Sequence, residues 1–556
     1  MPIPRFLSST LAALVACLAA AAPLAAGAAP KTVCTITVNS PDEKETFRRH
    51  LPPGDYQFVE LVERGRPDWL ASACQQHVSC DALIISGHFD GGEEFYTDRY
   101  DASEYLSVEE MERASCSDSC PGVFAQLKEV YLFGCNTLKP EPRQTASAEI
   151  VRALLRSGNA PADAARLSAL LGEKHAESNR DRMRHIFRNV PVIYGFSSKA
   201  PLGRYAGPLL DRYFQTAPAG EVGGGQVSAK LLGLFAPSSM TFTSGLTDGE
   251  SQASLRSDAC HFVDDRLSPA QKVAFLHEIL QRDMAEVRMF LGHLERFAAA
   301  VGPVQRLAPE TAAAFASIAG DGAARERYLA FARDADEPAV QTRMMALARN
   351  IGWLSPAQEQ AEFMRMISDR IARNAIGRDE VDLACARGRQ GNQDAALRPL
   401  ADGALRSGKI APAAALACLG SAEAHARVVR AVTSANADDI TIAQVYLRHR
   451  PLADAGELRA VAAAIGRMPA SGAQVRALET LAQQRLADPE SLREIARLFP
   501  LAKSVDVQRA IAGILIRSDY RVLGAADLAR SLQQYRIKSP DGSDVIDALI
   551  RVLQAS

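Results

Sequence analysis

Residues 83–96, "LIISGHFDGGEEFY", place a histidine directly after an apolar run. The run that ends at Ser86 has the composition of a buried strand, and the residues after His88 are polar and rich in glycine. A histidine in this position is either a core residue with a hydrogen-bond partner or a base at the carboxyl edge of a parallel sheet. The rest of the sequence has to distinguish these two interpretations.

Strand and helix signals alternate on both sides of this stretch. Helical segments separate short runs rich in apolar and β-branched residues, which are typical of buried strands; the runs are 32–38, 56–62, 81–86, 129–134 and 190–197. We therefore expect an α/β domain over residues 31–215, with a mainly parallel sheet flanked by helices.

The chain changes character at about residue 266. Residues 266–556 are rich in alanine, leucine and arginine, and three segments look alike: 336–352, 454–468 and 504–518. Their pattern resembles HEAT-like helical repeats, which implies an all-α, solenoid-like C-terminal domain; a helical domain without repeats is the alternative. Residues 216–265 are interpreted as a linker or an extension of the first domain.

Length and charge limit the classes of function. A chain of 556 residues is too long for one core, so two or three domains are expected. The formal net charge is -2, from 63 basic and 65 acidic residues, and this balance predicts no nucleic-acid partner.

Residues 1–28 are predicted to be a signal peptide. Arg5 precedes a long apolar segment that ends in Ala26-Gly27-Ala28, which has the form of a cleavage site. The alternative is the lipobox-like Leu14-Val15-Ala16-Cys17, which would leave Cys17 lipidated and the protein anchored. We expect a bacterial periplasmic protein, with an envelope lipoprotein or a secreted protein as alternatives. No later run is long enough for a transmembrane span.

Export favours disulfides among the ten cysteines. The close pairs Cys74/Cys80 and Cys116/Cys120 are the candidates. The second pair could also suggest a metal site, but no further ligand pair has zinc spacing, so no metal is expected. Cys135 is the predicted remaining thiol.

Cys135 follows the strand candidate at 129–134, as His88 follows the one at 81–86. Because consecutive parallel strands often lie side by side, both side chains are expected at one sheet edge. An imidazole near a thiol favours the thiolate, which is a nucleophile, and the same imidazole can protonate a leaving amine.

At this point the chain resembles the caspase-like (clan CD) cysteine peptidases, and among them CHAT domains. The motifs are Ser86-Gly87-His88, "YLSVEEMERA" at 105–114, Gly134-Cys135-Asn136-Thr137, and "VPVIYGFSSKAPLGRYAGPLLDRYF" at 190–214. The resemblance covers about residues 31–215. It implies hydrolysis of a protein or peptide substrate without a cofactor.

By this resemblance, Cys135 is the nucleophile and His88 the acid/base. The backbone amides of Cys135 and of Phe89, the residue after the histidine, would form the oxyanion hole. The family usually has glycine where this chain has Phe89, which tolerates fewer backbone conformations.

The sequence gives few indications of substrate specificity. The candidates for a specificity pocket are Ser197 at the end of the fifth strand, Lys199 after it, and Asp42 after the first strand. The helical domain would bind substrate or a protein partner. The alternatives are a catalytically inactive caspase-like scaffold and an envelope assembly protein that acts through the helical domain.

Overall fold

The computed structural model describes residues 29–61, 70, 74, 76–89, 92–97, 104–117, 121–141, 147–156, 158–175, 178–217, 219–387, 405, 408–469, 471–484, 486, 488–538 and 544–555. The predicted signal peptide and Cys17 lie outside these residues. The chain forms two units: Met1–Gln144 with Ala176–Arg266, and Thr145–His175 with Leu267–Ser556.

The first unit is built on a six-stranded sheet of order β2-β1-β3-β6-β7-β8. Its strands are β1 (Lys31–Thr37), β2 (Tyr56–Glu60), β3 (Ala82–Ser86), β6 (Glu129–Phe133), β7 (Val192–Phe196) and β8 (Met240–Thr243). Every pairing is parallel except that of β7 with the edge strand β8. The predicted parallel sheet is therefore confirmed, and β8 adds an antiparallel edge.

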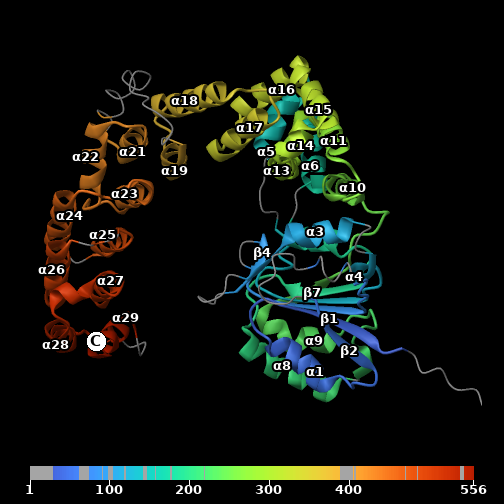
Figure 1. Ribbon diagram of the computed structural model, residues 1–556, viewed down its shortest axis with the longest axis horizontal. Helices are drawn as coiled ribbons and strands as arrows, with labels where there is room; N and C mark the ends of the chain where they lie inside the picture. The colour runs from blue at the N-terminus through green and yellow to red at the C-terminus, as the bar shows by residue number, and fades with distance from the viewer. Residues whose placement is uncertain are drawn as a thin grey trace, which may run out of the picture. The chain divides into compact units, whose positions relative to one another are not determined.

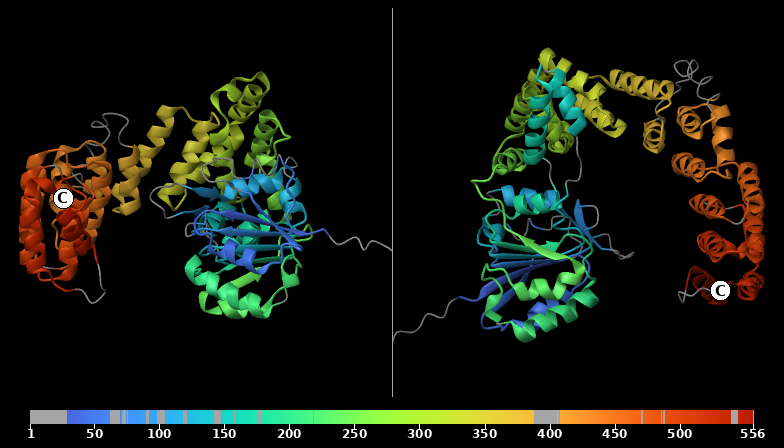
Figure 2. Two further views of the ribbon diagram at one scale, coloured as in Figure 1. Left: turned by 60° about the horizontal axis from the view of Figure 1, so that its bottom comes forward. Right: turned by 180° about the vertical axis from the view of Figure 1, so that it is seen from behind.

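Helices cover both faces of this sheet (Figure 1). On one face lie α1 (Asp42–His50), α8 (Gly203–Thr216) and α9 (Ala229–Phe235), which share one apolar core; on the other lie α3 (Val108–Cys116), α4 (Pro121–Ala125) and α7 (Asn179–Ile186), which share another. The view from behind in Figure 2 shows the same layers. Because both faces are covered, the central strands β3 and β6 are buried along their whole length.

A short antiparallel pair, β4 (Glu94–Tyr96) and β5 (Tyr105–Ser107), follows β3. Ser107 then caps α3 by accepting a hydrogen bond from the Glu110 backbone amide at 3.1 Å. The motif at 105–114 therefore comprises β5 and the first part of α3, which begins at Val108.

The disulfides differ from the predicted pairs. They join Cys34 to Cys80, Cys116 to Cys260 and Cys385 to Cys418. The predicted pair Cys74/Cys80 is therefore wrong, because Cys80 is bonded to Cys34, although Cys74 is also disulfide-bonded. The predicted pair Cys116/Cys120 is wrong as well, because Cys116 is bonded to Cys260. Cys120 itself lies outside the described residues.

Both pairs were predicted because their cysteines are close in sequence, and this criterion gave the wrong partners. Cys34 on β1 lies beside the chain that enters its sheet neighbour β3, and this brings it to Cys80. Cys116 is the last residue of α3, where a helix from much later in the chain packs against it. Cys135 is a reduced thiol, as the sequence predicted.

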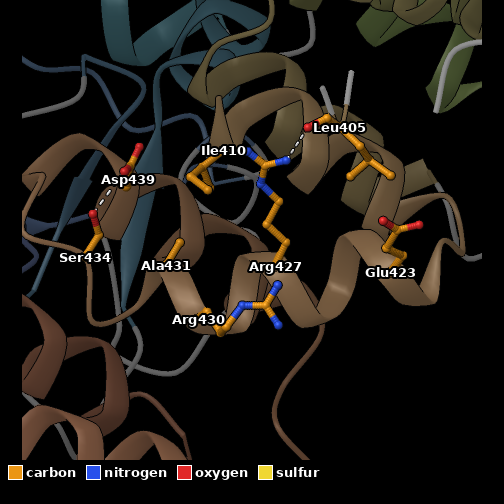
Figure 3. Close-up of a pocket in the computed structure, with 8 residues that line it drawn as sticks. All are labelled: Leu405, Ile410, Glu423, Arg427, Arg430, Ala431, Ser434 and Asp439. Carbon is orange, nitrogen blue, oxygen red and sulfur yellow. Dashed lines mark hydrogen bonds between the residues drawn. The ribbon is translucent and has the colours of Figure 1, made fainter. Parts of the chain in front are cut away.

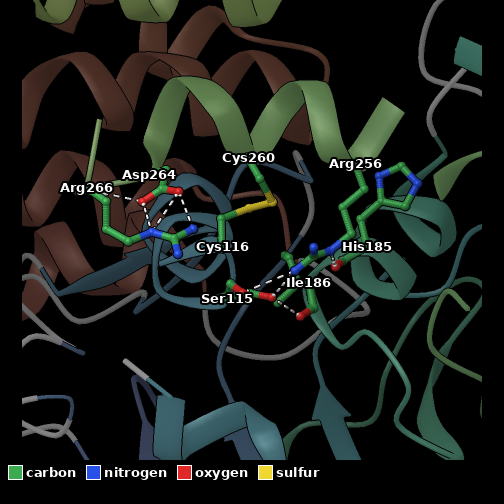
Figure 4. Close-up of a disulfide and its surroundings, with 8 residues drawn as sticks. All are labelled: Ser115, Cys116, His185, Ile186, Arg256, Cys260, Asp264 and Arg266. Carbon is green, nitrogen blue, oxygen red and sulfur yellow. Dashed lines mark hydrogen bonds and ion pairs between the residues drawn. A yellow bond between two sulfur atoms is a disulfide. The ribbon is translucent and has the colours of Figure 1, made fainter. Parts of the chain in front are cut away.

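The Cys116–Cys260 bond fastens α3 to α10 (Ala253–Val263) (Figure 4). Arg256, one turn earlier on α10, donates to the Ser115 carbonyl at 3.1 Å and to the His185 carbonyl at 2.8 Å. The segment 216–265, expected to be a linker or extension, therefore belongs to the α/β unit, since it supplies α9, β8 and α10.

The second unit is all-helical. It contains α5 (Ser147–Arg156) and α6 (Pro161–His175), which leave the α/β unit between β6 and β7. After residue 266 follow α11 (Pro269–Gln281), α12 (Met284–Met289), α13 (Leu291–Ala300), α14 (Pro303–Leu307), α15 (Pro309–Gly320), α16 (Gly322–Arg333), α17 (Pro338–Asn350), α18 (Pro356–Ala372), α19 (Arg378–Arg387), α21 (Ile410–Cys418), α22 (Ala422–Ala431), α23 (Ala437–His449), α24 (Ala455–Arg467), α25 (Gly472–Ala482), α26 (Pro489–Leu498), α27 (Val505–Leu515), α28 (Ala525–Tyr535) and α29 (Val545–Ala555).

The last of these helices stack in two layers. Figure 1 shows α21, α23, α25, α27 and α29 in one layer and α22, α24, α26 and α28 in the other. One continuous apolar core runs between the layers. The similar segments 454–468 and 504–518 form α24 and α27, which lie in opposite layers, so they are not equivalent members of a repeat.

The Cys34–Cys80 bond closes a sequence separation of 46 residues between buried positions. Replacing both cysteines with alanine is expected to lower the free energy of unfolding of the α/β unit by about 3–4 kcal/mol, because the unfolded chain regains loop entropy. Urea unfolding under oxidising conditions measures this change in the free energy of unfolding.

The matched control is the pair Cys385→Ala/Cys418→Ala, whose disulfide lies in the helical unit. It should leave the unfolding transition of the α/β unit unchanged. Equal effects of the two double variants on that transition would contradict the assignment.

Candidate functional site

His88 and Cys135 occupy matching positions after neighbouring strands. Parallel pairing of β3 with β6 sets Ser86 opposite Phe133, the last residue of each strand. His88 follows Ser86 by the same number of residues as Cys135 follows Phe133. The sheet therefore carries both side chains at one carboxyl edge, as the sequence predicted.

Both residues line one small cavity. It has a volume of about 40 Å³ and is bordered by Asn39, Ser40, Glu43, Ser86, Gly87, His88, Phe133, Gly134, Cys135 and residues 200–203. This volume exceeds what one water molecule needs but is too small for a large side chain. Cys135 and His88 are both half-buried, so solvent and a bound group can reach them.

The backbone of His88 is fixed by a β-bridge. Its N–H donates to the Tyr96 carbonyl at 2.9 Å and its carbonyl accepts from the Tyr96 N–H at 2.9 Å. The imidazole lies against the Tyr96 ring with centroids 5.3 Å apart, and Nε2 is buried. The strand pair β4–β5 thus orients the histidine.

The backbone after Cys135 turns sharply. Asn136 adopts φ 60°, a left-handed conformation that asparagine tolerates better than most residues. Its N–H donates to the Ser198 carbonyl at 2.7 Å, and its carbonyl accepts from Asn179 Nδ2 at 2.9 Å. Thr137 Oγ1 donates to the Gly134 carbonyl at 3.1 Å and closes the turn.

Phe89 supports the loop that carries Cys135 through its side chain. Its ring is fully buried, 4.6 Å from the ring of Phe95. A Cβ on Gly134 would meet Phe89 Cβ at 2.9 Å and the Gly87 carbonyl at 2.9 Å, so only glycine fits before Cys135.

The glycine usual in the resembled family is not needed at position 89. Phe89 does not have a positive φ, so residues other than glycine can adopt its backbone conformation. Among the described residues its backbone N–H donates to no protein acceptor, which leaves that donor available. The backbone conformation at this position is therefore compatible with phenylalanine.

Glu43 is a site residue that the sequence analysis missed. It is only 3% exposed and lines the cavity, and its Oε2 has no hydrogen-bond partner among the described residues. Burial is the main reason that its pKa is raised from 4.5 to about 7. The charge of Asp42 adds to the rise, whereas a hydrogen bond from its own backbone and the hydroxyls of Ser86 and Ser40 offset part of it. Its place in the first turn of α1 gave no sequence signal, because Asp42 precedes it with the same charge.

The three predicted specificity residues do not line the cavity. Asp42 is exposed and accepts a hydrogen bond from Ser40 Oγ at 2.9 Å. Lys199 is exposed. Ser197 donates its N–H to the Ser239 carbonyl at 3.1 Å, next to the edge strand β8.

The segment 200–203 borders the cavity in their place. Gly203 lets this segment approach α1 closely, because a Cβ there would collide with Ser40 Oγ. The chain after β7 therefore contributes to the site through its backbone path, which the residue types alone did not indicate.

A larger cavity of about 500 Å³ lies in the helical unit (Figure 3). It is lined by Leu405, Ile410, Glu423, Arg427, Arg430, Ala431, Ser434 and Asp439. Arg427 donates to the Leu405 carbonyl, and Ser434 donates to Asp439 at 3.0 Å. None of these described lining residues is a cysteine or a histidine. The smaller cavity, which contains both, is therefore the candidate site for catalysis.

Across the part of the chain that the structure describes, no group of acidic, histidine and cysteine side chains has the arrangement of a metal site. Within the same residues, no helix is long and apolar enough to cross a membrane.

The raised pKa of Glu43 predicts a pH-dependent stability. The folded state holds the Glu43 proton up to about pH 7, whereas the unfolded chain releases it near pH 4.5. The stability gained from the neutral carboxyl is thus complete below pH 4.5 and lost as pH rises to 7, by about 3 kcal/mol. Glu43→Gln should remove that loss, as urea unfolding at pH 4.5, 6 and 8 would show.

Glu45→Gln is the matched control, because it changes an exposed carboxyl on the same helix that is not among the groups acting on the Glu43 pKa. It should keep the wild-type slope of stability against pH. A Glu43→Gln variant with that same slope would show that Glu43 is ionised in the folded protein at neutral pH.

No family model matches the chain, and no curated protein and no solved structure was found to match it.

Proposed function

We propose that the chain is an exported caspase-like cysteine endopeptidase in which Cys135 is the nucleophile and His88 the acid/base. The observation that carries this proposal is the pairing of Ser86 with Phe133, which brings a reduced thiol and an imidazole to one cavity.

The chemistry follows from the two groups. The imidazole takes the thiol proton, and the Cys135 thiolate attacks the carbonyl carbon of a peptide bond. The C–N bond of the tetrahedral intermediate then breaks as imidazolium protonates the leaving amine. Water hydrolyses the thioester with His88 as the base, which releases the carboxylate product and restores the thiol.

Backbone donors would stabilise the negative oxygen of the intermediate. The N–H of Phe89 has no acceptor among the described residues, while those of Gly87 and Asn136 donate to the Phe133 and Ser198 carbonyls. Phe89 is therefore the donor that remains for substrate on the histidine side, and by the family resemblance the Cys135 amide would be the second donor.

Export and partner binding complete the proposal. Disulfides such as Cys34–Cys80 persist in an oxidising compartment, which supports a periplasmic protein. The stacked helices α21–α29 resemble a HEAT-like array, and we assign to them the binding of substrate or a protein partner. The cavity that contains Arg427 and Arg430 is a candidate contact for an acidic segment.

Hydrolysis should depend on both residues. The purified full-length protein, incubated with a proteome-derived peptide mixture, should generate new amino termini that mass spectrometry identifies. Cys135→Ala should abolish them, and His88→Ala should reduce their rate at least ~100-fold, the usual contribution of general acid–base catalysis.

His277→Ala is the control, because His277 lies on α11, outside the α21–α29 array, and bonds Asp321. It should keep the wild-type rate. If Cys135→Ala yields the same cleavage products as the wild type, the peptidase proposal is wrong; if no protein yields any, the inactive-scaffold alternative takes its place.

A further inference from the structure

The cavity beside Cys135 combines apolar surface with buried polar side chains. Phe133 and residues 200–203 supply apolar surface, while Glu43 on α1 and Ser86 on β3 are polar. All of these residues belong to the α/β unit. A mostly apolar pocket with a few placed polar groups is typical of sites that bind a ligand or a substrate side chain.

Two polar atoms at this cavity are buried without hydrogen-bond partners. Glu43 is 3% exposed and Ser86 is 2% exposed. Among the described residues, neither Glu43 Oε2 nor Ser86 Oγ has a hydrogen-bond partner, so the two atoms are not bonded to each other either. Buried polar atoms are almost always paired, because an unpaired one costs free energy. A group that enters the cavity and both donates and accepts hydrogen bonds would remove this cost.

The position of the cavity indicates which part of a substrate would enter it. Cys135 borders the same cavity, and in the proposed reaction its thiolate attacks the carbonyl carbon of a substrate residue. The Cα of that residue, which carries its side chain, is bonded directly to the attacked carbon. This side chain is therefore the part of the substrate within reach of a pocket next to the thiol.

Size and charge restrict that side chain. The volume of about 40 Å³ is room for roughly three water molecules, which excludes the long side chains of lysine and arginine. A carboxylate is disfavoured, because a second acidic group would lose its hydration beside Glu43. An apolar side chain would leave Glu43 Oε2 and Ser86 Oγ unpaired. A hydroxyl or an amide both donates and accepts, so it pairs with Glu43 in either protonation state.

We propose that Glu43 and Ser86 form a specificity pocket for a short, uncharged, hydrogen-bonding side chain on the substrate residue whose carbonyl Cys135 attacks. Serine, threonine and asparagine have such side chains. The inference rests on the proposed nucleophile role of Cys135 and names the substrate class of that site. Glu43 and Ser86 determine specificity in this account, and the proton transfers stay with His88.

The test compares peptidyl chloromethyl ketones that differ only in the side chain next to the ketone. The Cys135 thiolate displaces chloride and forms a thioether, so the rate reports on the pocket without any hydrolysis. Threonine and valine probes have nearly equal shapes, as do asparagine, leucine and aspartate probes, and a lysine probe tests for a basic side chain. Peptide mass identifies the modified cysteine.

The full-length wild-type protein should select the hydrogen-bonding probes at pH 7. The threonine probe should alkylate Cys135 at least about tenfold faster than the valine probe, because valine leaves buried polar atoms unpaired. The asparagine probe should likewise react at least about tenfold faster than the leucine, aspartate and lysine probes.

Three variants assign this preference to the pocket. Glu43→Met and Ser86→Ala each remove one hydrogen-bonding group and should each lower the preference for threonine over valine at least about threefold. Glu43→Gln keeps a donor and an acceptor at nearly the same shape and should retain the preference. Glu45→Met is the matched control, because it makes the same change at an exposed position of α1, and it should behave as the wild type.

Several results would overturn the proposal. They are equal rates for the threonine and valine probes, a lysine probe that reacts fastest, no alkylation of Cys135 by any probe, and an undiminished preference in both Glu43→Met and Ser86→Ala. Failure of the peptidase proposal appears separately, because the probe preferences would then persist while no new amino termini arise from the peptide mixture.

Discussion

The parallel pairing of β3 with β6 is the constraint on which the candidate site depends. A shift of one residue in this register would turn every side chain of one strand to the opposite face of the sheet and separate His88 from Cys135. The register is held from both sides, since β3 also pairs with β1 and β6 with β7. Packing of Phe89 and Phe95 against Gly134 then fixes the distance between the two loops.

Much of the sheet could be predicted because its strands are short apolar runs between helices. The strands ending at Ser86 and Phe133 were expected within one residue, and so was the placement of His88 and Cys135 at one edge. The antiparallel pairing of the edge strand β8 could not be predicted, because a single short run carries no information about the direction of its pairing.

Other features depend on contacts between residues far apart in the chain. The Cys116–Cys260 bond joins helices separated by most of the α/β unit, and no local spacing encodes it. Glu43 was overlooked because the fold, and not its neighbours in sequence, buries it beside Ser86. The assignment of α5–α6 to the helical unit depends on Glu149 meeting Arg288, which likewise leaves no local pattern.

The same kind of contact divides the segment between β6 and β7. Arg152 on α5 is paired with Asp336 at 2.7 Å inside the helical unit. Arg182 on α7 donates to the Gly92 carbonyl inside the α/β unit. The segment therefore contributes helices to both units.

The central claim, that Cys135 and His88 act together, is tested most directly by the ionisation of the thiol. Wild-type protein and His88→Ala, purified without reductant, are alkylated across pH 5 to 9 and the rate at Cys135 is followed by peptide mass. We predict a wild-type midpoint well below about 8.5, the ordinary pKa of a cysteine thiol, and a return toward that value in His88→Ala. Identical midpoints near 8.5 in both proteins would contradict the dyad.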